Sequence, residues 1–322
     1  MRSLRRALTA ASAVSLMTLS VTACTDDGST VRFGYISDYN GASLLAIADK
    51  QGLWDKQGLT PDIKVFTNGP LQIQALGSGD LDFGYIGPGA MWLPATGKAK
   101  VVAVNTLAYA DRVIGRPGVK TMQDLKGKKV GVPEGTSGDM VLNLALRKAG
   151  MTAGDIQKIP MDPATVVSAF SAGQIDGAGI WYPLIDTIKQ KVPDTVELAS
   201  TKEFPDSSFP TAFVGGTGVD QELTRKVIKV LQEANDWRAA HPEDSITEAA
   251  ALLKLDVAKV KADAANVQVM STADLVAKTK DGTVATWLNS LGDFFVSTGQ
   301  LKSRPDPATY YTGDLYTEAY TK

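Results

Sequence analysis

Carboxylates and aromatic side chains recur at the points where predicted strands end. The carboxylates are Asp38, Glu134 and Asp139, and the aromatic residues are Tyr39, Tyr85, Trp181 and Tyr182. Carboxylates beside aromatic faces suit an ammonium or guanidinium group. A structural interpretation is open for Glu134 and Asp139, because an acidic residue near the first turn of a helix stabilises that helix.

A second set of residues favours an anion. Small residues and asparagine precede predicted helices at Asn68-Gly69-Pro70, Gly87-Pro88 and Thr136-Ser137. Backbone N–H groups at helix N-termini and beside glycines can approach and bind oxyanions. The predicted lining contains no lysine or arginine. Together the two sets predict a zwitterion or a small organic cation, with a plain sulfonate or nitrate as the alternative.

A general rule about ligand binding in α/β folds selects the residues of the candidate site. In open α/β sheets, ligands bind beyond the carboxyl ends of the strands, against helix N-termini. No catalytic residue, metal ligand or cofactor is expected. The residues that this rule selects are Ser37, Asp38, Tyr39, Asn40, Asn68, Gly69, Tyr85, Gly87, Asn105, Glu134, Thr136, Ser137, Gly138, Asp139, Trp181 and Tyr182.

Short β-like runs alternate with helical patterns along the chain, which predicts an α/β fold with mostly parallel sheets covered on both faces. Strands are expected at 31–36, 63–66, 81–86, 101–104, 130–132, 156–159, 175–180 and 211–216. Helices are expected at 42–56, after Pro70, after Pro88, and at 139–149, 164–172, 220–240, 245–267 and 285–298.

The pattern occurs twice, which indicates two doubly wound lobes. Residues 75–86 and 169–180 share one order, in which a helix end and a glycine are followed by a polar turn, an aspartate and a strand. A chain of 322 residues also exceeds the usual size of one hydrophobic core. Lobe 1 is predicted from 31–112 plus 213–322, with a helical C-terminal region, and lobe 2 from 113–212. The chain crossings near Arg112–Ile114 and Thr211–Val214 would form a hinge, and a cleft between lobes is a preferred small-molecule site.

The N-terminus predicts export and a lipid anchor. Arg2, Arg5 and Arg6 precede an uncharged apolar stretch that is too short for a comfortable membrane span, so 1–23 is interpreted as a signal peptide. The ending Val21-Thr22-Ala23-Cys24 resembles the lipobox of bacterial lipoproteins, although leucine is commoner at the Val21 position. Cys24, the only cysteine, would then carry the lipid, and 24–30 would form the lipidated tether to the bilayer. An unmodified cysteine after an ordinary signal peptide is the alternative. The expected location is the cell membrane, on its extracellular or periplasmic face.

Composition excludes several function classes. The formal charge of −2, which becomes −5 once the three N-terminal arginines are removed, gives no electrostatic attraction to nucleic acid. The only histidine, His241, lies in a His-Pro-Glu-Asp turn, so a Ser/His relay is disfavoured. No G-x-S-x-G, H-E-x-x-H, Walker or G-x-G-x-x-G motif occurs. An enzyme is therefore not expected.

Five stretches carry a family resemblance: 48–59, Gly69-Pro70 before a helix, 79–88, 124–132 and the corner Ile180-Trp181-Tyr182-Pro183. Their order resembles the periplasmic binding protein-like type II fold, specifically the SsuA/THI5/NMT1-like solute-binding proteins for sulfonates, taurine, nitrate and thiamine precursors. The resemblance covers about 31–310. Many relatives have an acidic residue where Tyr182 stands, which leaves the identity of the ligand open.

The resemblance implies a mechanism and partners. The lobes would close on a small solute, and a monomer would deliver it to an ABC permease and its ATPase. A sensor subunit that presents its ligand to a membrane receptor is an alternative with the same fold. A thiamine-precursor-related enzyme is disfavoured, because that branch uses its own histidine as substrate and this chain contains a single histidine, His241. The cysteine-rich segment associated with the thiamine-precursor branch is also missing.

Overall fold

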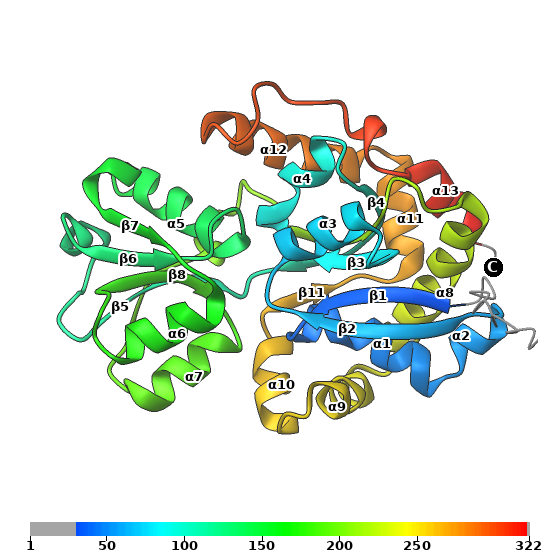
Figure 1. The fold of residues 1–322 in the computed structure, drawn as a ribbon, viewed down its shortest axis with the longest axis horizontal. Coiled ribbons are helices and arrows are strands. Elements are labelled where there is room, and N and C mark those ends of the chain that lie inside the picture. Colours follow the sequence, from blue (N-terminus) through cyan, green and yellow to red (C-terminus); the bar gives the residue numbers. More distant parts are fainter. Residues whose placement is uncertain (1–29, 321–322) are drawn as a thin grey trace, which may run out of the picture.

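Two sheets form two bodies that lie side by side in the computed structural model, which describes residues 30–320 (Figure 1). The expected signal peptide, Cys24 and all of the tether except its last residue, Thr30, lie outside the described residues. Among the helices of 30–320, none combines the length and the hydropathy that crossing a membrane requires.

The first sheet has six strands in the order β11-β4-β10-β3-β1-β2. β1 runs parallel to β2 and β3, whereas β10 runs antiparallel to both β3 and β4, and β11 runs antiparallel to β4. The strands are β1 (Thr30–Ile36), β2 (Thr60–Phe66), β3 (Phe83–Ile86), β4 (Lys100–Ala108), β10 (Pro210–Gly215) and β11 (Val267–Val269).

The second sheet has five strands in the order β7-β6-β8-β5-β9. β6 runs parallel to β7 and β8, whereas β5 runs antiparallel to β8 and β9. The strands are β5 (Asp111–Gly115), β6 (Lys129–Val132), β7 (Gln157–Pro160), β8 (Gly177–Trp181) and β9 (Val196–Ser200).

Helices cover both faces of each sheet (Figure 1). With the first sheet are α1 (Tyr39–Lys50), α2 (Leu53–Lys56), α3 (Gly69–Ser78), η1 (Pro88–Ala90), α4 (Trp92–Ala95), α8 (Gln221–Ala240), α9 (Pro242–Leu253), α10 (Val257–Ala264), α11 (Thr272–Lys280), α12 (Thr283–Ser297), η5 (Pro307–Thr309) and α13 (Gly313–Ala319). With the second sheet are η2 (Met122–Leu125), α5 (Ser137–Lys148), η3 (Ala153–Asp155), α6 (Pro163–Ser171), α7 (Leu184–Lys191) and η4 (Thr201–Glu203).

Local sequence explains where the helices beside the sheets begin and end. Asp38 caps α1 by accepting a hydrogen bond from the backbone N–H of Gly41 at 2.7 Å, and Asn68 caps α3 in the same way. α3 and α6 each end at a left-handed glycine, Gly79 at φ 79° and Gly173 at φ 73°. The two segments that share a residue order therefore fold into the same helix–turn–strand corner.

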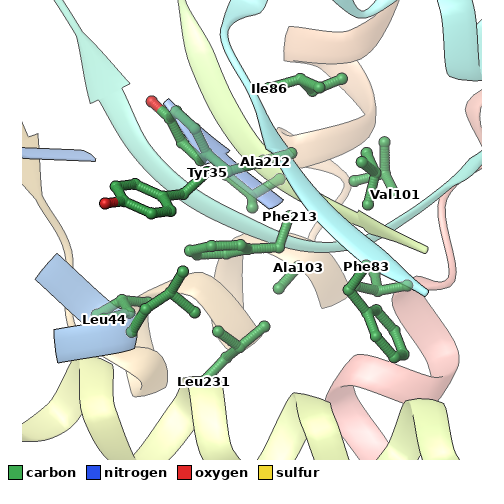
Figure 2. Packing of buried hydrophobic residues seen from close by; sticks show 14 of the residues in the cluster. Tyr35, Leu44, Phe83, Ile86, Val101, Ala103, Ala212, Phe213 and Leu231 are labelled. Atoms are coloured by element: carbon green, nitrogen blue, oxygen red, sulfur yellow. The ribbon is translucent and has the colours of Figure 1, made fainter. Parts of the chain in front are cut away.

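The larger core lies between the first sheet and its helices. Phe213 projects from β10 toward Leu44 of α1 and Leu231 of α8 (Figure 2). Its ring meets Phe33 edge-on at 5.7 Å between ring centres and lies equally far from Tyr85. Burial of this aromatic cluster holds the strands whose ends form the site.

The structure differs from the sequence-based expectations in three respects. Both sheets are mixed, where mostly parallel sheets were expected, because β10 and β5 return antiparallel beside the parallel strands. The strands β5, β9 and β11 were not expected. The chain passes between the sheets at 109–110 and 204–209, so the expected crossings Arg112–Ile114 and Thr211–Val214 lie within strands β5 and β10. The division into lobes at 112 and 213 stays a prediction.

Candidate functional site

A cavity lies where strand ends of the two sheets meet. It encloses about 500 Å³ of empty space, part of which is open to solvent. β1, β2, β3 and β4 end at this edge of the first sheet, and β6 and β8 end at the facing edge of the second. The antiparallel strands β10 and β5 begin there instead. The ends of parallel strands and the starts of antiparallel ones therefore converge on one volume.

Ten of the predicted site residues line this cavity. They come from both sheets, as the rule about strand ends predicts. These residues are Asp38, Asn40, Asn68, Gly69, Tyr85, Gly87, Thr136, Ser137, Trp181 and Tyr182.

Three predicted residues of the first lobe lie outside the lining. Ser37 is exposed. Tyr39 is buried, and its hydroxyl lies 2.7 Å from the Ser245 hydroxyl. Asn105 is buried below the cavity, where its amide donates to the Asn40 carbonyl and its oxygen accepts from Arg238 at 2.8 Å. Tyr39 and Asn105 thus support the walls of the cavity.

Three predicted residues of the second lobe also lie outside the lining. Glu134 is exposed, and Lys158 lies 3.4 Å from its carboxylate. Asp139 is buried, pairs with Lys158 at 2.8 Å and accepts from the Gly135 N–H. Gly138 packs against β8, where a Cβ atom would lie 2.5 Å from the carbonyl oxygen of Gly179. These residues fix the loop before α5, which agrees with the structural interpretation of both carboxylates.

The structure adds eight lining residues to the ten, and of these the sequence had pointed only to Pro88, as part of Gly87-Pro88. Among them, Asp111 begins β5 and stands opposite Trp181 of β8. Recognising β5 as an antiparallel strand would have identified Asp111, but the sequence pattern did not predict that strand. Asp263 comes from α10, far along the chain, and no local signal marks it. The added residues are Ile36, Pro88, Ala90, Ala108, Ala110, Asp111, Thr211 and Asp263.

The cavity is acidic. Three buried carboxylates, Asp38, Asp111 and Asp263, contribute to its wall, and among the described residues no lysine, arginine or histidine lines it. One oxygen of Asp38 accepts from the Gly41 N–H, and one oxygen of Asp263 accepts from the Tyr39 N–H at 2.7 Å. Both carboxylates are thereby aimed at the start of α1.

Burial dominates the electrostatics of these carboxylates. Loss of solvent raises the pKa of Asp111 to about 6, although a hydrogen bond with the Ser137 hydroxyl and the charge of Arg112 act in the opposite direction. Burial and the charge of Asp263 together raise the pKa of Asp38 well above its usual range. Burial likewise raises the pKa of Asp263, with Asp186 and Asp111 adding repulsion.

The aromatic side of the cavity is partly committed to other contacts. The hydroxyl of Tyr182 donates to Glu197 and accepts from Lys189. The Arg112 guanidinium lies 5.4 Å from the centre of the Tyr182 ring, and the Lys189 ammonium lies 5.6 Å from it. Burial raises the pKa of Glu197, but hydrogen bonds from Lys189, Tyr182 and Arg112 outweigh it and bring the pKa to about 2. Trp181 and Tyr85 have no cation on their rings in the described part of the chain.

The two lobes touch beside the cavity. Trp92 of the first lobe donates from its indole N–H to the Gly135 carbonyl at 3.3 Å. Gly89 lies so close to the second lobe that a Cβ atom there would be 2.2 Å from the backbone of Thr136. The wall formed by 87–92 and 135–137 therefore depends on close backbone approach.

Among the described residues, no group of three His, Cys, Asp or Glu side chains is placed to hold a metal ion.

Two α/β lobes with a cavity between their strand ends form the periplasmic binding protein type II fold. The chain belongs to the NMT1/THI5-like family, whose model matches residues 42–245. A putative binding protein of Brucella abortus is 55% identical over 90% of this chain and 92% of its own length. A putative aliphatic sulfonates-binding protein of Escherichia coli is 28% identical over 74% of this chain and 76% of its own length.

Solved structures agree on the fold. The alkanesulfonate-binding protein SsuA from Xanthomonas axonopodis pv. citri, bound to MOPS, superposes with a TM-score of 0.67 at 22% identity, over 88% of this chain and 98% of that chain. The desulfurization enzyme DSZB superposes with a TM-score of 0.63 at 13% identity, over 90% of this chain and 98% of that chain. Because a binding protein and an enzyme share this fold, function must be argued from the site.

Proposed function

We propose that this chain is the exported solute-binding subunit of an ABC importer. It binds a small polar organic solute of the zwitterionic, sulfonate or amine/guanidinium type in the cavity between the lobes, and it hands that solute to a permease powered by an ATPase. It carries no catalytic activity, and Cys24 anchors it to the membrane through lipid.

The observation that carries this proposal is the position of the cavity. Both sheets contribute walls to it, so a bound solute would contact Asp38 and Asn68 of one lobe and Ser137 and Trp181 of the other. A ligand that touches both lobes stabilises the closed arrangement by its differential affinity for that arrangement. The names of the relatives support the same class, since the Brucella and Escherichia coli proteins are described as binding proteins.

The proposal is tested by screening solutes for thermal stabilisation of the purified protein. Taurine, alkanesulfonates, nitrate, betaines, amines and guanidine form the set, because a ligand of the native state raises the melting temperature by mass action. We expect at least one of these solutes to stabilise the protein in a saturable manner.

A cavity-filling variant locates the binding. Ala110→Leu places extra carbon atoms inside the cavity and should abolish the stabilisation, whereas Ala153→Leu adds the same atoms to an exposed turn of the second lobe and should preserve it. Well-folded protein that no solute stabilises would contradict the proposed function, and equal stabilisation of both variants would place the ligand elsewhere.

A further inference from the structure

We propose that the solute is an organic cation bearing N–H donors, of the ammonium, amidinium or guanidinium type, and that Asp111 is its principal counter-charge. This inference rests on the proposed function and selects one ligand class among those that it leaves open. Asp38 and Asp263 assist Asp111 from the opposite lobe.

The first argument is an unused acceptor. Asp111 is only 2% exposed, it lines the cavity, and its Oδ1 atom has no hydrogen-bond partner. Neighbouring Arg112 does not supply one, because its guanidinium donates to Glu197, Asn266 and the backbone carbonyls of Tyr109 and Asp111. The Ser137 hydroxyl bonds this carboxylate but leaves Oδ1 without a donor. Burying an unsatisfied oxygen of an ionised group is costly, and an N–H group of the ligand would remove that cost.

The second argument is convergence of like charge. Asp111 belongs to the second sheet, whereas Asp38 precedes α1 and Asp263 lies in α10, both in the first lobe. When ionised, these groups repel one another across the cavity, and no basic side chain among the described residues lines the cavity to offset them. Buried Arg238 lies outside the lining and donates to Ser43, Asn105 and Asn235. A cation between the carboxylates would replace repulsion by attraction and draw the lobes together.

The third argument concerns the anion alternative. Two helix N-termini beside the cavity, those of α1 and α3, are already capped by the protein's own side-chain oxygens, whereas Thr136 forms no such bond at the start of α5. At the start of α1, the N–H groups of Tyr39 and Gly41 donate to Asp263 and Asp38. At the start of α3, the N–H of Leu71 donates to Asn68 at 3.0 Å. An anion at the start of α1 or α3 would have to displace these acceptors, and anywhere in the cavity it would meet a wall that carries three carboxylates.

The experiment compares matched probes of different charge by calorimetry and thermal shift at pH 8. Guanidine and methylguanidine are the cations, urea and methylurea are neutral molecules of the same shape, and ethanesulfonate is the anion. We expect the cations to bind at least about 30-fold more tightly than their neutral counterparts, as for a desolvated charge pair. Asp111→Asn should lower cation affinity by a similar factor, whereas Glu134→Gln, which removes a charge outside the cavity, should change it less than about twofold.

The outcomes separate this inference from the proposed function. Asp111→Asn is not expected to impair folding, since that substitution keeps the shape of the side chain and removes a charge that burial disfavours. The comparison of guanidine with urea needs no variant. Binding of ethanesulfonate in place of the cations, or cation binding unchanged by Asp111→Asn, would overturn the cation proposal and leave solute binding intact. If no probe of either charge binds, and the wider solute screen also fails, both proposals fall.

Discussion

At the scale of single residues, the buried carboxylates make the empty protein sensitive to pH. The pKa of Asp111 rises to about 6 in the folded chain from 3.8 without the fold. Between these values the folded chain binds more protons than the unfolded chain, so the free energy of unfolding falls as pH rises. The stabilising contribution is complete below pH 3.8 and is lost as pH rises through about 6.

Asp111→Asn should therefore flatten the pH dependence of stability. Asparagine cannot ionise. Between pH 5 and pH 8, the free energy of unfolding of the variant should therefore fall by about 1 kcal/mol less than that of the parent protein. Urea unfolding at the two pH values measures this difference, with Glu134→Gln as the control. Identical pH dependence in the parent and in Asp111→Asn would contradict the assigned ionisation.

At the scale of elements, the contact between η1 of the first lobe and the start of α5 in the second sets how closely the lobes approach. Gly89 is the residue on which this contact depends, since any side chain there meets the backbone of Thr136, which cannot rotate away. The geometry predicts that the closed arrangement requires glycine at this position.

Gly89→Ala should weaken ligand binding at least about tenfold, because overpacking of this size costs about 1–3 kcal/mol. Gly77→Ala is the matched control, since a Cβ atom at Gly77 of α3 meets nothing within 4 Å and alanine suits a helix. Calorimetry measures the affinities, and small-angle scattering reports whether the lobes stay apart. Unchanged affinity in Gly89→Ala would show that binding does not need this contact.

At the scale of the whole molecule, the proposed membrane anchor would serve the same task as the lobes. The described residues form a pair of lobes around a cavity, and the Cys24 anchor is proposed to keep that pair beside its permease. Two lipid chains on one cysteine give stable attachment, where a single chain is marginal.

Cys24→Ser should release the protein from the membrane, because the only thiol in the chain is lost. Fractionation of cells that express the full chain, with metabolic labelling by a fatty acid, measures the release. Arg5→Lys is the control, since it keeps the basic N-terminus and should keep both label and membrane association. Continued labelling of Cys24→Ser would refute lipidation at this residue.

The sequence by itself determined the family and the local architecture. Alternating patterns predicted most strands and helices, and Asn68 and Gly79 marked helix ends by chemistry that acts within a few residues. Position at strand ends was enough to select ten residues that line the cavity. These signals act between residues that are close in the sequence, so they can be recognised without the tertiary structure.

Only the tertiary structure decided the charge of the site. Asp263 reaches the cavity through a hydrogen bond to Tyr39, 224 residues away, and Asp111 faces it because β5 pairs antiparallel with β8. Conversely, Glu134 and Asp139 form ion pairs with Lys158 and do not line the cavity. Burial and ion pairing depend on which distant segments come into contact, and local sequence patterns do not predict those contacts.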